Sequence, residues 1–296
     1  MSDITVTDVM AVVFDFDDTL MPDTTTALLR KHGIRPEEFW PQAKALIDEG
    51  YDQPSAYLRL LLDNVGEGKP LGKLTNRALS EFGATLDGEY YRGLPAFFDD
   101  LRNDIEKQFK GSIKVEYYII SGGLQSILRG NSVVAKYFSG VYGCILGESK
   151  ETGLVTHIKR SITFTEKTRY LFEINKGVKQ EVSDSNPFLV NEDIPQEERR
   201  IPFRNMVYVG DGLTDIPCFS TVKHFKGKVL GIFDPTNSEN TKRAIEKFLV
   251  PTRVMGVYKP EYGPTDQLGS LLRSLILTRA SEIALDRQMA KKVSKP

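Results

Sequence analysis

The stretch that most constrains the fold is VMAVVFDFDDT, residues 9–19. Its first part, residues 9–14, is entirely apolar, which is typical of a strand buried on both faces of a parallel sheet. Carboxylates then follow at Asp15, Asp17 and Asp18. Because side chains alternate along an extended chain, we expect Asp15 and Asp17 to point to the same side. Carboxylates packed this densely indicate a cation site at the end of the strand.

Composition is that of an ordinary globular protein. Of 296 residues, 40% are hydrophobic and 27% are charged. No apolar run approaches the roughly 20 residues that a membrane helix needs, and the first residues show no secretory signal, so we expect a cytoplasmic protein without a membrane partner. A formal net charge of -1 without a long basic run argues against nucleic acid as a partner. A homo-oligomer is compatible with this composition.

The order of apolar and polar segments predicts an α/β protein. Residues 24–91 carry helical patterns without a strand, which predicts a mostly helical unit inserted after the first strand; the simpler alternative places these helices in the main core. From residue 93 onward helices and strands alternate, as in a parallel sheet covered by helices on both faces. Strands are predicted at residues 114–120, 205–209, 229–233 and 253–258, with a hairpin from 144–146 and 154–158. The polar, mostly acidic residues 178–204 are predicted to form a long surface excursion.

Four polar clusters lie at predicted strand or helix ends. They are residues 15–19, residues 121–123, Lys167 and residues 211–215. The cluster at 121–123, SGG, is predicted to be a turn that opens a helix. Each cluster alone has an ordinary explanation as a turn, a helix cap or a solvated lysine. Since ligands of open α/β sheets bind at the carboxyl ends of strands, the four together indicate one composite site.

These motifs resemble those of the haloacid dehalogenase-like hydrolase superfamily, and most closely its phosphoserine-phosphatase-like branch with a helical cap. The resemblance lies in FDFDDTL, YYIISGG, the lysine of TFTEKTRYLF and VYVGDGLTD, in this order. It implies a Rossmann-like, doubly wound parallel sheet formed by residues 1–23 and 92–296. Residues 24–91 would then be a mobile cap over the site.

The resemblance implies a phosphatase in which Asp15 is the nucleophile and forms an aspartyl-phosphate. Asp17 would act as the general acid and then as the general base. The group that binds the substrate phosphate would consist of Thr19, Ser121, Gly122, Gly123 and Lys167. Within this group Thr19 would also position Asp17, while Lys159 and Lys176 are alternatives to Lys167. A small phosphorylated metabolite would be the substrate.

The same resemblance implies one Mg²⁺ ion. Asp15, Asp211 and the main-chain carbonyl of Asp17 would hold it, with Asp215 acting directly or through water. Hard oxygen ligands suit Mg²⁺ better than zinc, and the chain's two cysteines and three scattered histidines offer no zinc-like spacing. Asp18 has no assigned role.

The same carboxylates bear on which activity of this family the chain has. A metal-free dehalogenase is disfavoured because Asp17, Asp211 and Asp215 are present. A phosphomutase and a catalytically silent binding module stay open as alternatives. Within residues 24–91, the side chains that can contact a leaving group are Arg30, Arg35, Arg59, Arg77, Trp40 and Tyr57, although surface charge and cap core are simpler explanations for them.

Overall fold

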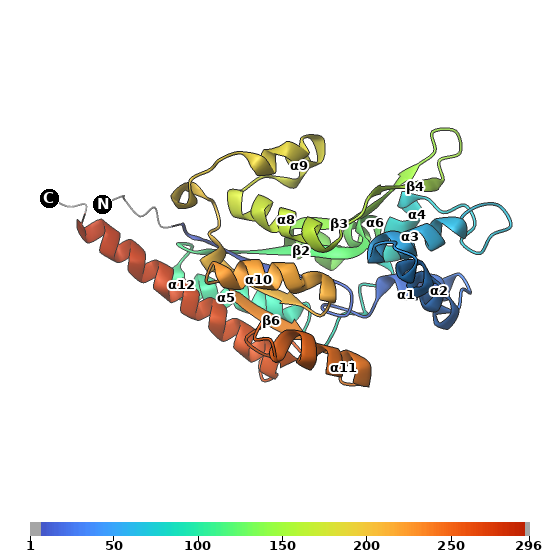
Figure 1. Ribbon diagram of the computed structural model, residues 1–296. Coiled ribbons are helices and arrows are strands. Elements are labelled where there is room, and N and C mark those ends of the chain that lie inside the picture. Colours follow the sequence, from blue (N-terminus) through green and yellow to red (C-terminus); the bar gives the residue numbers. More distant parts are fainter. Residues whose placement is uncertain (1–6, 294–296) are drawn as a thin grey trace.

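A computed structural model describes residues 7–293 and contains a seven-stranded sheet of order β4-β3-β2-β1-β5-β6-β7 (Figure 1). Neighbouring strands are parallel except for the antiparallel pair β3 and β4. The strands are β1 (Val9–Phe14), β2 (Lys114–Leu124), β3 (Phe138–Glu148), β4 (Val155–Arg160), β5 (Met206–Gly210), β6 (Lys228–Ile232) and β7 (Val257–Tyr258). The predicted α/β class with a mainly parallel sheet is confirmed.

Helices occupy most of the connections between strands. They are α1 (Thr24–Lys31), α2 (Pro36–Asp48), α3 (Gln53–Asp63), α4 (Asn76–Ala84), α5 (Ala96–Phe109), α6 (Gln125–Gly130), α7 (Ser132–Tyr137), α8 (Phe164–Lys176), α9 (Gln180–Ser185), α10 (Ile216–His224), α11 (Ser238–Ala244) and α12 (Gln267–Val293). Short 3₁₀ turns are η1 (Pro187–Asn191), η2 (Gln196–Glu198), η3 (Phe203–Asn205) and η4 (Leu213–Asp215), and η5 (Ile245–Leu249) is a π-helical turn. Within residues 7–293, no helix combines the length and apolarity needed to cross a bilayer.

The strand order reverses at β1, which lies between β2 and β5. Because crossovers between parallel strands are right-handed, the connection from β1 to β2 and the connections to β5 and β6 cover opposite faces of the sheet. Accordingly α5 packs with α12, whereas α8 packs with α10 (Figure 1). The carboxyl ends of β1 and β5 therefore border the crevice in which open α/β sheets bind ligands.

Aromatic side chains pack around Phe14, the last residue of β1. Phe14 is fully buried, and its ring contacts Phe98 and Phe138 at centroid distances of 6.2 Å and Tyr262 at 6.3 Å. These edge-on contacts join β1 to α5, to β3 and to the segment before α12. The carboxylates that follow Phe14 thus start from a tightly packed base.

The expectation that residues 121–123 form a turn opening a helix is wrong. Strand β2 continues through them to Leu124, and α6 begins only at Gln125. Ile120 pairs with Tyr142 and Leu124 with Cys144, so residues 121–123 stand opposite the single intervening residue of β3. This bulge frees backbone groups at the strand end without requiring a turn.

The expected strand at residues 253–258 is also mostly wrong, because β7 contains only Val257 and Tyr258. Thr252 adopts a left-handed conformation with φ of 54°, and the N–H of Arg253 donates to Phe248 in η5. The chain is therefore still completing the turn after η5 where the sequence predicted an extended strand.

Other predicted segments are present. The hairpin of β3 and β4 is antiparallel, with turn residues at 150–152. Residues 178–204 form α9 and short turns with mostly exposed side chains. Gln180 is one of the buried residues of this segment and ties it to β3, because its side chain bonds both the N–H and the carbonyl group of Val141.

The helical insertion after β1 comprises α1 to α4, and Figure 1 shows α1, α2 and α3 grouped at one end of the sheet. Helix α4 crosses α6 with the two backbones in direct contact. A Cβ added to Gly83 of α4 would lie 2.0 Å from the carbonyl oxygen of Ile127, and one added to Gly130 of α6 would lie 1.9 Å from that of Ser80. Only glycine fits at these two positions. The assignment of residues 24–91 to a mobile cap stays a prediction.

Candidate active site

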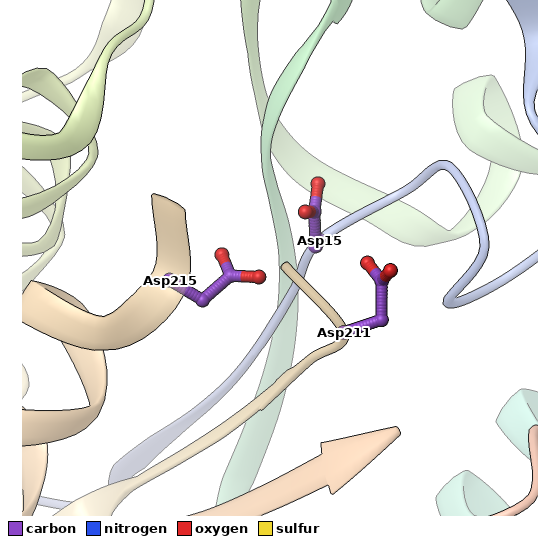
Figure 2. A group of neighbouring side chains, drawn as sticks. All are labelled: Asp15, Asp211 and Asp215. Atoms are coloured by element: carbon purple, nitrogen blue, oxygen red, sulfur yellow. The ribbon is translucent and has the colours of Figure 1, made fainter. Parts of the chain in front are cut away.

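The carboxylates of Asp15, Asp211 and Asp215 converge at the carboxyl ends of β1 and β5 (Figure 2). All three residues are buried, and each offers an oxygen within 4.8 Å of the other two. Asp15 directly follows β1, Asp211 directly follows β5, and Asp215 ends η4. The structure thus brings together the three side chains that the sequence placed at separate strand and helix ends.

Lys167 reaches this group from the first turn of α8. Its side chain is fully buried, and Nζ donates to Asp15 Oδ2 at 2.8 Å and to Asp215 Oδ1 at 2.7 Å. Burial alone would lower the pKa of Lys167, but the carboxylates of Asp15 and Asp215 outweigh burial and raise it. Lys159 is exposed on β4. Lys176 lies at the far end of α8 and donates to the backbone carbonyl groups of Val190 and Glu192. Of the three lysines considered, Lys167 is the one that contacts the carboxylates.

Burial dominates the electrostatics of the group. It raises the pKa of Asp15 to about 7, with Asp215 adding to the rise and Lys167 opposing it. Burial, followed by repulsion from Asp15 and Asp215, holds the pKa of Asp211 well above its ordinary value. The negative charge of the carboxylates therefore exceeds what Lys167 neutralises, and a bound cation would stabilise their ionised forms.

The two carboxylates that follow β5 differ in how many protein donors they receive. For Asp215, Oδ1 accepts from Lys167 and from the Tyr208 hydroxyl at 2.7 Å, and Oδ2 accepts from the N–H of Gly212 at 2.9 Å. With both oxygens engaged, Asp215 suits an indirect role beside a metal better than direct ligation.

Asp211 is much less engaged. Its Oδ1 lies 3.5 Å from the Thr19 hydroxyl, and its Oδ2 lies 3.7 Å from Nη2 of Arg243. Lone pairs of Asp211 are therefore free beside those of Asp15. Because the donor set consists of buried, partly unpartnered carboxylate oxygens, these residues fit Mg²⁺.

Asp17 lies next to this group, with each oxygen in a defined environment. Oδ1 accepts from the N–H of Thr24 at 2.8 Å. Oδ2 faces the backbone of Gly123, where an added Cβ would lie only 2.5 Å away. Burial, with repulsion from Asp23 as the next cause, raises the pKa of Asp17 well above its ordinary value. A carboxyl whose pKa is raised in this way is suited to general-acid catalysis.

The bulge at the end of β2 forms another wall. The Ser121 hydroxyl accepts from the N–H of Gly123 at 2.9 Å, so this N–H would have to exchange partners in order to bind an anion. The carbonyl of Gly122 accepts from the Tyr57 hydroxyl at 2.7 Å. Through Tyr57, helix α3 of the insertion contacts the backbone beside the predicted phosphate-binding residues.

A pocket of about 330 Å³ opens over these groups. Its core side includes the carboxylates of Asp15, Asp17 and Asp211, and its far side includes Trp40 and Tyr57 of α2 and α3. This volume suits a small metabolite. The four arginines considered for the leaving group do not line the pocket; Arg30 is exposed, and Arg35, Arg59 and Arg77 pair with exposed acids on their own helices.

Comparisons with known proteins agree on the fold. No protein-family model matches the sequence. An uncharacterised protein of Borreliella burgdorferi is 29% identical in an alignment 238 residues long, which covers 73% of this chain and 79% of that protein. A HAD family hydrolase from Salmonella enterica serovar Typhi superposes with a TM-score of 0.53 at 14% identity, over 86% of this chain and 68% of that one. A phosphoserine phosphatase, solved as a phospho-aspartyl intermediate analogue, gives a TM-score of 0.53 at 15% identity, over 90% of this chain and 99% of that one.

This chain has a haloacid dehalogenase-like fold. The fold is phosphoserine-phosphatase-like. A substrate-bound phosphoserine phosphatase also superposes, with a TM-score of 0.52 at 14% identity over 90% of this chain and 97% of that one. The resemblance seen in the motifs is thereby confirmed for the fold.

Two features of the candidate site were not anticipated from the motifs. Thr19 is fully buried and approaches Asp211 rather than Asp17, while its carbonyl accepts from Tyr262 at 2.8 Å. Arg243 of α11 lines the pocket although it belongs to none of the motifs. No local pattern marks Arg243, because its position depends on how α11 packs after β6.

Proposed function

We propose that the chain is a Mg²⁺-dependent phosphomonoesterase that acts on a small phosphorylated metabolite through an aspartyl-phosphate intermediate. The observation that carries the proposal is the buried contact of Lys167 with Asp15 and Asp215 beside the open carboxylate of Asp211. Burying a lysine between two carboxylates carries a desolvation cost, so its presence here supports a functional role for these three side chains. Here the lysine contacts Asp15, the carboxylate that directly follows β1 and that borders the pocket.

In the proposed reaction, Asp15 attacks the phosphorus atom and the bond to the leaving oxygen breaks. Asp17 donates its proton to that oxygen, so a neutral alcohol departs. Asp17 then accepts a proton from a water molecule, whose oxygen attacks the phosphorus of the aspartyl-phosphate and releases phosphate and Asp15. Lys167 offsets the negative charge on Asp15 and on the phosphoryl group. The raised pKa of Asp17 supports its role as the proton donor.

Asp15, Asp211 and the main-chain carbonyl of Asp17 would hold the Mg²⁺ ion, with Asp215 supporting them indirectly. When bound, the ion would neutralise charge on the phosphoryl oxygens and orient them for in-line displacement. Ser121 and the backbone of Gly122 and Gly123 would bind the phosphoryl oxygens, and Thr19 would position Asp211 within this group. Residues 24–91 would cover the pocket as a cap.

The decisive experiment is a phosphate-release screen over phosphorylated metabolites, with and without Mg²⁺. We expect turnover of at least one substrate by the wild type only with Mg²⁺, and loss of that turnover in Asp15→Asn. Asp17→Asn is a second variant, which should lower turnover of substrates with poor leaving groups more than that of p-nitrophenyl phosphate, because nitrophenolate needs no proton in order to leave.

Other outcomes would replace the proposal. Absence of Mg²⁺-dependent turnover on every substrate would favour the binding module. Turnover that survives Asp15→Asn would contradict the aspartyl-phosphate. Transfer of phosphate between positions of one sugar, with little release, would indicate a phosphomutase.

A further inference from the structure

Arg243 enters the pocket from the side, at the end of α11. This helix follows β6, which lies two strands away from β1 in the sheet. With strands about 4.8 Å apart, its starting point is about 10 Å to the side of the strand that carries Asp15. The chain changes to the π-helical turn η5 directly after α11, and such turns are frequent at functional sites.

The guanidinium group of Arg243 lacks hydrogen-bond partners within the described part of the chain. Its shortest polar contact, Nη2 to Asp211 Oδ2, is 3.7 Å long, which is too far for a hydrogen bond. Its Nε atom is buried without any partner, although the side chain as a whole is 38% exposed. Nε and Nη2 form the edge of an arginine that binds oxyanions with two parallel hydrogen bonds. That edge is unused here.

The other cations near the pocket are already paired. Lys44 lines the opposite wall, and its Nζ contacts both carboxylate oxygens of Asp48, at 3.1 and 3.0 Å. Lys167 is held between Asp15 and Asp215. The transferred phosphoryl group would have Lys167 and the end of β2 beside it. An arginine on the flank that makes no hydrogen bond within the described residues, and only a long ion-pair contact with Asp211, is therefore available to another part of the ligand.

We propose that Arg243 determines substrate specificity by binding, through its Nε–Nη2 edge, an oxyanion carried by the leaving group. This inference rests on the proposed function, because it assumes that the phosphoryl group binds at Asp15. The oxyanion is a carboxylate or a second phosphate, both of which match the two parallel donors of a guanidinium group.

The test uses three phosphonates that the enzyme cannot hydrolyse, each in the presence of Mg²⁺. Propylphosphonate carries no second anion, 3-phosphonopropionate adds a carboxylate, and propane-1,3-bisphosphonate adds a second phosphonate. Trp40 is the chain's only tryptophan and lines the same pocket, so its fluorescence reports binding without turnover. We expect the wild type to bind at least one of the two doubly functional ligands about 10- to 100-fold more tightly than propylphosphonate.

Arg243→Gln should remove this preference, because it should weaken binding of the preferred doubly functional ligand at least about 10-fold more than it weakens binding of propylphosphonate. Arg243→Lys keeps the charge but not the two-donor edge, and should retain only part of the preference. The matched control is Lys242→Gln, which makes the same charge change at the adjacent, exposed position of α11 and should retain the full preference.

The results separate failure of this inference from failure of the proposed function. Equal affinity of the wild type for all three phosphonates, or equal weakening of all three by Arg243→Gln, would overturn the role of Arg243 while leaving a phosphate site in place. Absence of binding by any of them would overturn the proposed function, and the role of Arg243 with it. Whichever second anion is preferred identifies the source of the oxyanion.

Discussion

Replacing Lys167 with methionine tests the electrostatic centre of the site. Methionine has a similar length and no charge, so Lys167→Met preserves most of the packing while leaving Asp15 and Asp215 without their shared cation. The lysine is fully buried, and its hydrogen bonds to these carboxylates measure 2.8 and 2.7 Å, with the Asp215 side chain also at 0% exposure. Water therefore has no access to the Asp215 side of this contact.

Removal of one partner from a buried ion pair typically costs about 3–5 kcal/mol. Since Lys167 serves two carboxylates, we expect Lys167→Met to lower the free energy of unfolding by an amount near the upper end of that range. Single domains are stable by only about 5–15 kcal/mol, so the variant will be close to unfolding. Urea denaturation followed by circular dichroism, in Mg²⁺-free buffer, measures the loss.

Two further variants make the result interpretable. Lys159→Met makes the same chemical change on the exposed face of β4 and should alter stability by less than about 0.5 kcal/mol. Lys167→Met combined with Asp215→Asn removes one of the stranded charges and should recover at least about 1 kcal/mol, which also covers the case in which the single variant does not fold. If Lys167→Met were as stable as Lys159→Met, the carboxylates would not depend on Lys167 and the reasoning would be refuted.

Three other changes give distinct readouts. Burial would raise the pKa of Glu116, but hydrogen bonds from neighbouring basic side chains lower it from 4.5 to about 2. Converted at 1.36 kcal/mol per pH unit and discounted because those basic partners are partly exposed, this shift predicts that Glu116→Gln lowers the free energy of unfolding by about 2 kcal/mol at pH 7. The loss should become smaller as the pH falls from about 4.5 to 2, because Glu116 is then protonated first in the unfolded and finally in the folded wild type. Urea denaturation at pH 7 and pH 3 checks this, and a pH-independent difference would contradict it. Gly123→Ala places a Cβ 2.5 Å from Asp17 Oδ2 and should lower phosphate release at least about 100-fold in a folded protein, whereas near-normal kcat would show that Asp17 tolerates displacement. Gly130→Ala should destabilise by about 3 kcal/mol or more because its Cβ would overlap the backbone of α4, while Gly88→Ala, with nothing within 4 Å, serves as the control in the same denaturation assay.

Much of the fold could be predicted because its signals are local. The apolar run before Asp15 and the alternation of helix and strand each depend on neighbouring residues, and together they identified the α/β class and the mainly parallel sheet. Lys167 and Asp15 are 152 residues apart, and only the resemblance in motif order suggested that they meet.

The errors came from features that depend on a partner segment. Residues 121–123 contain two glycines and look like a turn, yet pairing with β3 keeps them in a bulged strand. Arg243 reaches the pocket because of the way α11 and η5 pack, which no spacing in the sequence encodes. Thr19 approaches Asp211 because β1 and β5 are neighbours in the sheet, and the residue pattern of a single strand does not specify which strand pairs with it.

The backbone contact between α4 and α6 limits how this protein can be recombined with its relatives. Gly83 of α4 lies against the backbone of α6, and Gly130 of α6 lies against the backbone of α4. A chimera that exchanges all of residues 24–91 would therefore put a foreign helix against α6. Asn76 adds to this attachment, because its side-chain amide donates to the carbonyl of Leu146 in β3. Exchange boundaries at about residues 24 and 72 would leave α4 with its host and transplant only α1 to α3, which carry Trp40 and Tyr57. For library construction, the unit that can be exchanged is therefore shorter than the helical insertion.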